Sequence, residues 1–322
     1  MAPLVSVLLP VYNGEPYLAE AVESILHQSF SDFELLIIDD GSQDRSGQIL
    51  QAYAQRDTRI RLIRRANRGL IATLNEMLDL AQGEFLARMD ADDIATPDRL
   101  ALQVQFLQQH PQVVCVGGAF DLIDAQGQVV QQVPMPEQNA EIQQMLLIGR
   151  TIINHPCALI RSSALRQIGG YDPTMRTVED LDMLLKLGEI GELANLPDTV
   201  LQYRFHFGSV SAQNMLFQSQ MAEAACERAW QRRGIQGHYD APQPWYRPSP
   251  HPDSRQQFWL RYGWWAFMQG WRSTAVRCGL GAVWAKPTRI ESWKLLGCAL
   301  LKPVPPPPPV PQTQPAPIAV SK

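Results

Sequence analysis

Cysteine is scarce in this chain, and its pattern excludes two kinds of protein. The five cysteines among 322 residues are far apart and form no CxxC pair. Isolated thiols of this kind are typical of a reduced, cytosolic protein, and they argue against a disulfide framework and against a cysteine-rich zinc site. We therefore expect a cytoplasmic protein.

Long uncharged apolar runs are also missing. None reaches the roughly 18 residues that a membrane-spanning helix needs, so we expect a protein that is soluble or bound at most to the surface of the cytoplasmic membrane. The first residues, "MAPLVSVLLPVYNGE", contain an apolar run without a basic leader, and Pro10 interrupts it. This pattern predicts a first strand and not a signal peptide.

A strong excess of charge is absent from the chain as a whole. The net charge is −4 and the pI about 5.9, which argues against nucleic acid as a partner. Two nucleotide-binding motifs are absent as well, because no GxGxxG follows the first predicted strand and no GxxxxGK[ST] occurs. Neither a Rossmann dinucleotide site nor a P-loop is therefore indicated.

The first hundred residues contain short apolar runs that alternate with helical patterns. In each intervening segment the apolar side chains fall on one face of a helix. Repeated β-α units of this length predict an α/β fold with a doubly wound, mostly parallel sheet flanked by helices. The predicted strands cover residues 4–9, 33–38, 60–63 and 84–89, and the predicted helices begin near Leu18, pass through Leu50 and cover 70–81.

Beyond residue 117 the alternation loosens. "GGAFDLIDAQGQVVQQVP" predicts a hairpin that turns near Gly127, and "HPCALI" (155–160) predicts another strand. We expect a helix to open at "EDLDMLLKL" and a last strand over "TVLQYRF". In "ATPDRL", Thr96 and Pro97 are expected to begin a helix as its N-cap and first residue.

Four aspartates crowd into "MDADDIATPDRL" (89–100), directly after the fourth predicted strand. Asp98 is explained as a first-turn acid of the following helix. Asp90 and Asp92 are either part of a solvated acidic loop or ligands of a divalent cation that substrate phosphates complete. An EF-hand is excluded, because its sixth and twelfth positions require Gly and Glu, and the chain has Ala95 and Ala101 there.

Polar residues also end the first two predicted strands. Tyr12 in "VYNGE" offers a ring on which a base can stack, and Asp40 in "DDGS" can accept hydrogen bonds from a nucleobase or a ribose. Alone, each has an ordinary explanation as a packing residue or a turn. Ligands of open α/β sheets bind at the carboxyl ends of the strands, so three such ends together predict one binding site.

Four segments, in this order, resemble family 2 glycosyltransferases of the GT-A fold. They are "SVLLPVYNGEPYLAEAVESILHQSFSDFELLIIDDGSQD", "NRGLIATLNEMLDLAQGEFLARMDADD", "VEDLDMLLKL" and "YRFHFGSVS", and the resemblance runs from about Leu4 to Ser211, roughly two thirds of the chain. It implies a nucleotide-sugar donor, a saccharide or lipid-linked acceptor, and Mn²⁺ or Mg²⁺ as cofactor.

The resemblance also implies roles for the acidic residues. Asp90 matches the aspartate that contacts the nucleoside sugar, and Asp92 the aspartate that binds the metal at the diphosphate. Asp180, preceded by Glu179, matches the general base. On the residues alone, Asp180 is equally well explained as an N-cap or a salt-bridge partner. A helix start would keep its carboxylate ionised, as a base requires.

The remaining implied contacts are weaker. Arg204 and His206 in "YRFHFGS" match a pair that lies over the diphosphate, with His206 as a further metal ligand, although a histidine between phenylalanines is often structural. Arg68 beside Gly69 is a solvated arginine or part of a turn near the base. His155 and Cys157 border an acceptor cleft or are ordinary strand residues. The implied nucleoside contacts are Pro10, Tyr12, Asp40, Gly69 and Asp90.

The chemistry expected of these residues is a single displacement. One base and one attacking hydroxyl predict inversion at the anomeric carbon, and a cation at Asp92 would neutralise charge on the leaving diphosphate. Two alternatives stay open: a nucleotidyltransferase, which would want a glycine-rich basic loop after the first strand, and an inactive scaffold, in which the acidic motifs would be eroded.

The last third of the chain has a different composition. All eight tryptophans lie at or beyond Trp230, and residues 255–302 contain six of them, eight Lys or Arg and one acid, so this window carries +7 and the remainder −11. We predict a glycosyltransferase domain (1–212), a tryptophan-rich basic helical tail (213–302) and a disordered proline-rich end (303–322). The tail docks on the catalytic domain, forms a homo-oligomer or lies on a membrane surface, and we favour the first two.

Overall fold

The computed structural model describes residues 2–205, 215–240 and 251–303. The chain divides into two compact units. The first comprises Met1–Leu122 and Gln132–Pro244, and the second Ile123–Gln131 and Trp245–Lys322. The predicted boundary lies at residue 212. The two compact units instead divide near residue 244, after the helix that follows residue 212.

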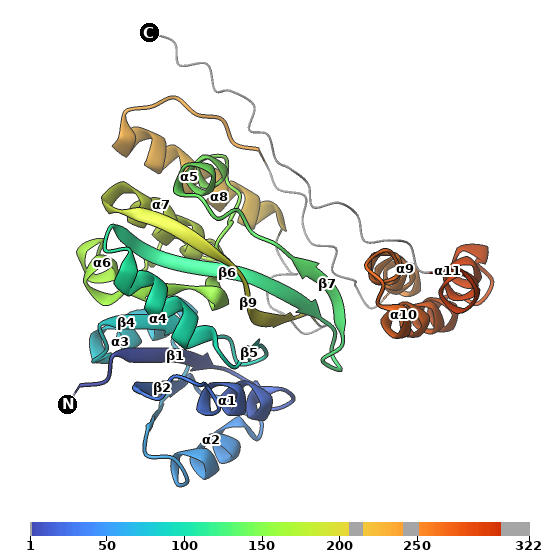
Figure 1. The fold of residues 1–322 in the computed structure, drawn as a ribbon, viewed down its shortest axis with the longest axis horizontal. Coiled ribbons are helices and arrows are strands. Elements are labelled where there is room, and N and C mark those ends of the chain that lie inside the picture. The colour runs from blue at the N-terminus through green and yellow to red at the C-terminus, as the bar shows by residue number, and fades with distance from the viewer. Residues whose placement is uncertain (1, 206–214, 241–250, 304–322) are drawn as a thin grey trace. The chain divides into compact units, whose positions relative to one another are not determined.

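The first half of the first unit is a parallel sheet, as the sequence predicted. Its strands are β1 (Val5–Val11), β2 (Phe33–Asp39), β3 (Ile60–Arg64) and β4 (Phe85–Arg88), and they lie in the order β3-β2-β1-β4 (Figure 1). The pairs β1–β2, β2–β3 and β1–β4 are all parallel. Their carboxyl ends, where Tyr12, Asp40 and Asp90 follow, therefore share one edge of the sheet.

The second half of the sheet is mixed. Strand β8 (Leu159–Arg161) runs antiparallel to both β4 and β6 (Val113–Ile123), and β5 (Ile94–Ala95) runs antiparallel to β9 (Glu192–Arg204). Strand β7 (Val129–Val133) pairs with β6 across the hairpin that the sequence predicted, and Gly127 adopts φ 76° in its turn.

Helices cover both faces of this sheet, and each face has its own apolar core. Neighbouring strand residues alternate between the cores: Leu8 and Leu36 lie in one, and Leu9 and Leu35 in the other. The first core is covered by α3 (Leu70–Leu80), α5 (Asn139–Leu147), α6 (Ser162–Gln167), α7 (Glu179–Ile190) and α8 (Met215–Arg233). The second is covered by α1 (Leu18–Leu26), α2 (Ser46–Ala54) and α4 (Arg99–Gln109).

Two local predictions were wrong. Helix α4 begins at Arg99, with Asp98 as its N-cap, because Thr96 is drawn into the sheet: its backbone N–H donates to Val200 and its Oγ1 to the carbonyl of Thr199, at 3.1 and 3.0 Å. The predicted strand 155–160 forms only at its end, as part of β8, and its first residues are a 3₁₀ turn, η1 (His155–Cys157), since Pro156 cannot donate to the strand ladder.

The second unit contains three helices that pack on one another: α9 (Pro252–Met268), α10 (Arg272–Ala285) and α11 (Ile290–Leu301). Phe258, Tyr262 and Leu295 are buried among them. The tip of the β6–β7 hairpin belongs to the same unit, since Thr274 Oγ1 donates to the carbonyl of Val129 at 2.9 Å. Among the described helices, none has the length and hydropathy needed to cross a bilayer.

Helix α8 leads to a prediction about truncation. Its buried Ala225, Cys226 and Ala229 complete the first core, and Trp230 Nε1 donates to the carbonyl of Leu147 at 3.0 Å. A chain ending at residue 212 loses these contacts, whereas one ending at residue 240 keeps them. At about 1 kcal/mol for each lost side chain and about 2–4 °C per kcal/mol, we expect the shorter chain to melt at least roughly 6 °C lower in calorimetry. Equal melting temperatures would contradict this account of α8.

Candidate active site at the carboxyl edge of the sheet

The loops after β1 and β2 are joined by side chains that hydrogen-bond to backbone. Asn13 N–H donates to Ser42 Oγ at 2.9 Å, and Gln43 N–H donates to Asn13 Oδ1 at 2.8 Å. Asn13 adopts φ 53°, a left-handed conformation that asparagine tolerates better than most residues. Beside these bonds Tyr12 is 53% exposed, so its ring is available as a stacking surface.

Asp40 is buried and organises the loop that precedes α3. Its Oδ1 accepts from the Arg68 N–H and its Oδ2 from the Gly69 N–H, both at 2.8 Å, and Arg65 forms an ion pair with it. Gly69 has φ 86°, where a residue with a side chain would be strained. Asp40, in the loop after β2, and Gly69, in the loop after β3, are thus neighbours held together by the carboxylate itself.

The acidic stretch after β4 forms a cluster of three carboxylates. Oxygens of Asp90, Asp92 and Asp93 lie within 4.8 Å of one another. Asp93 is fully buried, its Oδ1 accepts from the Arg204 N–H at 2.8 Å, and its Oδ2 has no hydrogen-bond partner among the described residues. Asp93 is not among the residues predicted from sequence, although its place beside Asp92 was a signal that could have suggested a role.

One buried guanidinium lies among these acids. Arg88, the last residue of β4, is 4% exposed and forms an ion pair with Asp90. Burial raises the pKa of Asp90, and Asp92 raises it further, whereas Arg88 opposes both. The pKa of Asp93 is raised well above the usual range by burial and by the charges of Asp92 and Asp90.

Glu179 and Asp180 begin α7 and share the same electrostatic environment. Asp180 Oδ1 accepts from the Leu181 N–H at 2.8 Å. Burial nevertheless raises the pKa of Asp180, so the helix start does not dominate as expected. Burial and Asp180 raise the pKa of Glu179 to about 7, and the charge of Asp90 raises both values. The charge of Asp90 therefore acts on this pair as well as on the acidic cluster.

Arg204 holds the segment of the acidic cluster in place. Its Nε donates to the carbonyl of Asp92 at 2.8 Å, its Nη2 pairs with Glu20 at 2.5 Å, and its guanidinium lies 4.5 Å from the centre of the Tyr17 ring. These contacts of the buried side chain position the loop, and its predicted place over a diphosphate stays a prediction. His206, its predicted partner, lies outside the described residues.

His155 and Cys157 are buried beneath the site and do not border an open cleft. His155 Nε2 lies 3.0 Å from the Tyr171 hydroxyl. Burial, together with the charge of Arg88, lowers the pKa of His155 well below its usual value, so its imidazole is neutral. Burial raises the pKa of Cys157 to about 12, which keeps it a thiol. Their alternative explanation, as ordinary structural residues, fits the structure.

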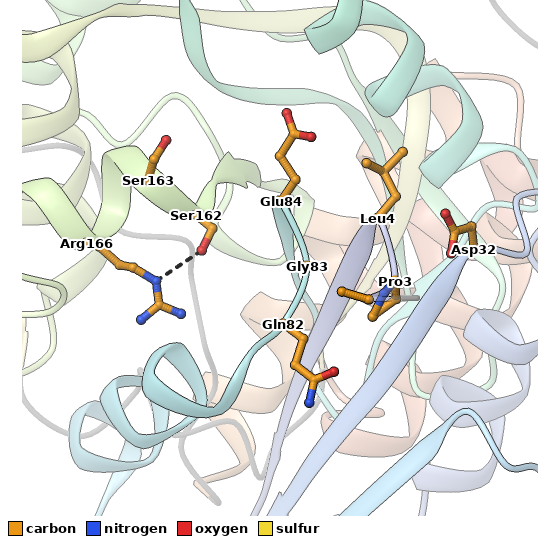
Figure 2. A pocket seen from close by; sticks show the side chains of 10 residues that line it. Pro3, Leu4, Asp32, Gln82, Gly83, Glu84, Ser162, Ser163 and Arg166 are labelled. Carbon is orange, nitrogen blue, oxygen red and sulfur yellow. Dashed lines mark hydrogen bonds between the residues drawn. The ribbon is translucent and has the colours of Figure 1, made fainter.

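A separate hollow of about 560 Å³ lies at the opposite edge of the sheet (Figure 2). Leu4, Gly83 and Asp32 line it, and they directly precede or approach the amino ends of β1, β4 and β2. Arg166 and Ser162 close one side with a hydrogen bond of 3.3 Å. This hollow contains none of the predicted site residues, which gather at the carboxyl ends of the strands.

Comparison with known proteins identifies the family. The family model described as glycosyl transferase family 2 matches residues 6–169, about half of the chain. This chain belongs to glycosyl transferase family 2. Within the family, EpsE of Bacillus subtilis (strain 168), which is named as a glycosyltransferase, is 37% identical over 197 residues, covering 59% of this chain and 68% of EpsE. The expected enzyme class, a glycosyltransferase, is thereby confirmed.

Other glycosyltransferases share parts of the sequence or the fold. The chondroitin synthase of Escherichia coli is 27% identical over 240 residues, which are 74% of this chain but only 34% of the synthase. Staphylococcus aureus TarS 1–349 with UDP-GlcNAc matches at TM-score 0.58 and 18% identity, covering 93% of this chain and 87% of that one. The mannosyltransferase PcManGT of Pyrobaculum calidifontis, with GDP-Man and Mn²⁺, matches at 0.53 and 20%, covering 94% and 81%. These likenesses confirm the GT-A-type fold.

The raised pKa of Glu179 leads to a prediction about stability. Its pKa is about 7 in the folded chain against an ordinary 4.5, so the native state binds the extra proton between these values. The free energy of unfolding therefore falls as pH rises through this window, and the penalty is complete above pH 7. With EDTA present, Glu179→Gln should melt at least about 3 °C above the native chain at pH 8 and equally at pH 4. An advantage that does not change with pH would contradict the titration.

Proposed function

We propose that this family 2 glycosyltransferase transfers a sugar from a nucleoside-diphosphate sugar to an acceptor hydroxyl with inversion of the anomeric carbon. The observation that carries the proposal is the cluster of three carboxylates, Asp90, Asp92 and Asp93, that follows β4, together with the charge of Asp90 acting on a second acidic group, Glu179–Asp180. One group suits a cation and a diphosphate, and the other suits a hydroxyl that must lose its proton.

In this proposal the nucleoside binds across the first two strand ends. The exposed Tyr12 ring stacks on the base, Pro10 lies in the strand beneath it, and Asp40 holds Gly69 and its loop beside the base. Asp90 contacts the ribose. Two structural neighbours were solved with nucleotide sugars, GDP-Man and UDP-GlcNAc, which supports a donor of this class. The choice of base and sugar depends on contacts that differ between them.

The acidic cluster suits a hard divalent cation. All three groups are carboxylates, which Mn²⁺ and Mg²⁺ prefer, and the buried Asp93 Oδ2 lacks a partner among the described residues. We assign Asp92 as the principal ligand, with Asp93 facing the same position; His206 was a further predicted ligand. When bound, the cation supplies neutralisation of the negative charge that develops on the leaving diphosphate.

Asp180 serves as the general base. The acceptor oxygen forms a bond to the anomeric carbon as the bond from that carbon to the diphosphate oxygen breaks, and the electron pair of the broken bond leaves with the diphosphate. The hydroxyl proton passes to Asp180, whose Oδ1 is already engaged by Leu181, so Oδ2 receives it. A raised pKa makes this carboxylate a stronger base than an ordinary aspartate. Its neighbour Glu179 has a raised pKa as well, because burial and the charge of Asp180 disfavour its ionised form.

The acceptor is a saccharide or a lipid-linked sugar in this proposal. The relative named as a chondroitin synthase supports a saccharide, although this chain corresponds to a third of it. Of the two alternatives raised by the sequence, a nucleotidyltransferase gains no support, because the loop after β1 has a single glycine and no basic residue. If the chain were an inactive scaffold, it would bind the nucleotide-sugar donor but would not transfer the sugar.

Nucleotide binding should depend on Asp92. Titrating the native chain with nucleoside diphosphates and Mn²⁺ to about 100 times the Kd should raise its melting temperature by roughly 5–10 °C. Asp92→Asn should lose most of the Mn²⁺-dependent part of this shift. Asp98→Asn is the matched control, since Asp98 belongs to the same acidic stretch but is exposed and makes no side-chain cap bond. If Asp92→Asn keeps the native shift, Asp92 does not bind the metal.

Turnover should depend on Asp180 more than binding does. We expect Asp180→Asn to lower kcat by about 10²–10⁴-fold while the Mn²⁺- and nucleotide-dependent thermal shift stays close to native. Product NMR with the native chain should show inversion at the anomeric carbon. A retained configuration, or a kcat for Asp180→Asn within threefold of native (roughly 0.7 kcal/mol), would refute the single displacement with this base.

A further inference from the structure

The outer face of α11 in the second unit carries apolar side chains that the unit does not bury. Ile290, Trp293 and Leu301 are 77%, 52% and 85% exposed, and Leu300 is exposed as well. In chain order, Ile290, Trp293, Leu300 and Leu301 follow one another at spacings of three, seven and one residues, which places them along one face of the helix. Gly297 lies between them with open space above its Cα. These five residues are called the α11 stripe below.

The opposite face of α11 shows that the stripe is not simply an unfinished core. Leu295, Leu296 and Ala299 are buried against the neighbouring helices, so α11 already has a complete internal interface. Trp293 Nε1 donates to the carbonyl of Pro287 at 2.8 Å, which holds the ring in place while half of it stays exposed. Trp284, at the end of α10, is 75% exposed and lies 5.1 Å below the guanidinium of Arg255.

Basic side chains accompany the stripe. Arg289, Lys294 and Lys302 are exposed at the two ends and in the middle of α11, and Glu291 is the single acid between residues 255 and 302. Exposed aliphatic and tryptophan side chains flanked by Lys and Arg are the composition of helices that lie in the plane of a bilayer surface. The tryptophan ring suits the headgroup layer, and the cations suit anionic lipids.

We propose that the α11 stripe binds the surface of an anionic lipid bilayer and anchors the second unit there as a peripheral element. Charge decides against a second copy of this chain as the occupant, because stripe-to-stripe contact would bring together two segments that each carry +7. The proposal does not depend on the reaction at the first unit. It also reverses the preference for oligomer packing that composition alone suggested.

The test is flotation of the full chain with lipid vesicles. The vesicles are phosphatidylcholine alone or phosphatidylcholine with about 30% phosphatidylserine, an anionic surface on which each Lys or Arg adds to binding. We expect the native chain to float with the anionic vesicles, and the double variant Ile290→Ser, Trp293→Ser to bind about tenfold or more weakly. Ile235→Ser removes an exposed aliphatic side chain from the first unit and should bind as native.

A second variant separates charge from apolar contact and does not touch the Trp293 hydrogen bond. Arg289→Gln with Lys294→Gln should also lower binding by about tenfold or more, and circular dichroism checks that both double variants stay folded. Native binding by the apolar variant overturns the proposal, and so does the absence of flotation with anionic vesicles. A native chain that ignores vesicles but self-associates in sedimentation velocity through Trp293 would assign the stripe to a second copy instead.

Discussion

The site depends on one buried cation, the guanidinium of Arg88. Burial lowers its pKa, but the charge and hydrogen bond of Asp90, together with the charges of Tyr171 and Asp93, outweigh burial, so the pKa is raised and the group stays charged. Its positive charge also opposes the raised pKa values of Asp93, Glu179 and Asp180. Ionised carboxylates cannot be gathered in a buried site without such a partner. β4 places Arg88 in the centre of the sheet, where loops from both halves meet it.

Two other arginines, at the edge of the site, also form ion pairs with carboxylates. Arg65 pairs with Asp40 and with Glu76, at 2.8 Å from the latter, and so fixes the loop that carries Gly69. Arg204 ties the backbone of Asp92 to Glu20 on α1. In each case an ion pair positions a loop whose other atoms remain available to a ligand. The acids of the motifs are thus divided between those that build the loops and those that line the site.

Much of this arrangement was readable from sequence, and the reasons are local. Short apolar runs predicted the parallel strands because strands covered on both faces are continuously apolar, and Gly127 predicted the hairpin because its turn requires a positive φ. The strand ends then placed Tyr12, Asp40 and Asp90 on one edge. The resemblance to family 2 glycosyltransferases, which the family match confirms, supplied the rest of the candidate residues.

The features that sequence did not predict depend on contacts between distant segments. Thr96 looked like an N-cap, but its backbone N–H and its hydroxyl instead donate to carbonyls of β9, more than a hundred residues away. The burial of Arg204 and its contacts with Asp92 and Asp93 follow from the pairing of β5 with β9, which brings the segment between β4 and β5 against that strand. Local patterns carry no information on such partners. The first compact unit extends past residue 212 for a similar reason, since the small apolar residues of α8 share a core with helices far upstream.

The hairpin tip within the second unit has a consequence for folding kinetics. The bond from Thr274 to Val129 spans 145 residues, and the ion pair of Arg277 with Asp124 spans 153. Closing loops of that length costs conformational entropy before the contacts that stabilise the closed loop can form. On a ribosome, the tip emerges long before α10 is synthesised, so the second unit is completed only after translation of its last helices. Its assembly is therefore a late step in the folding of the chain.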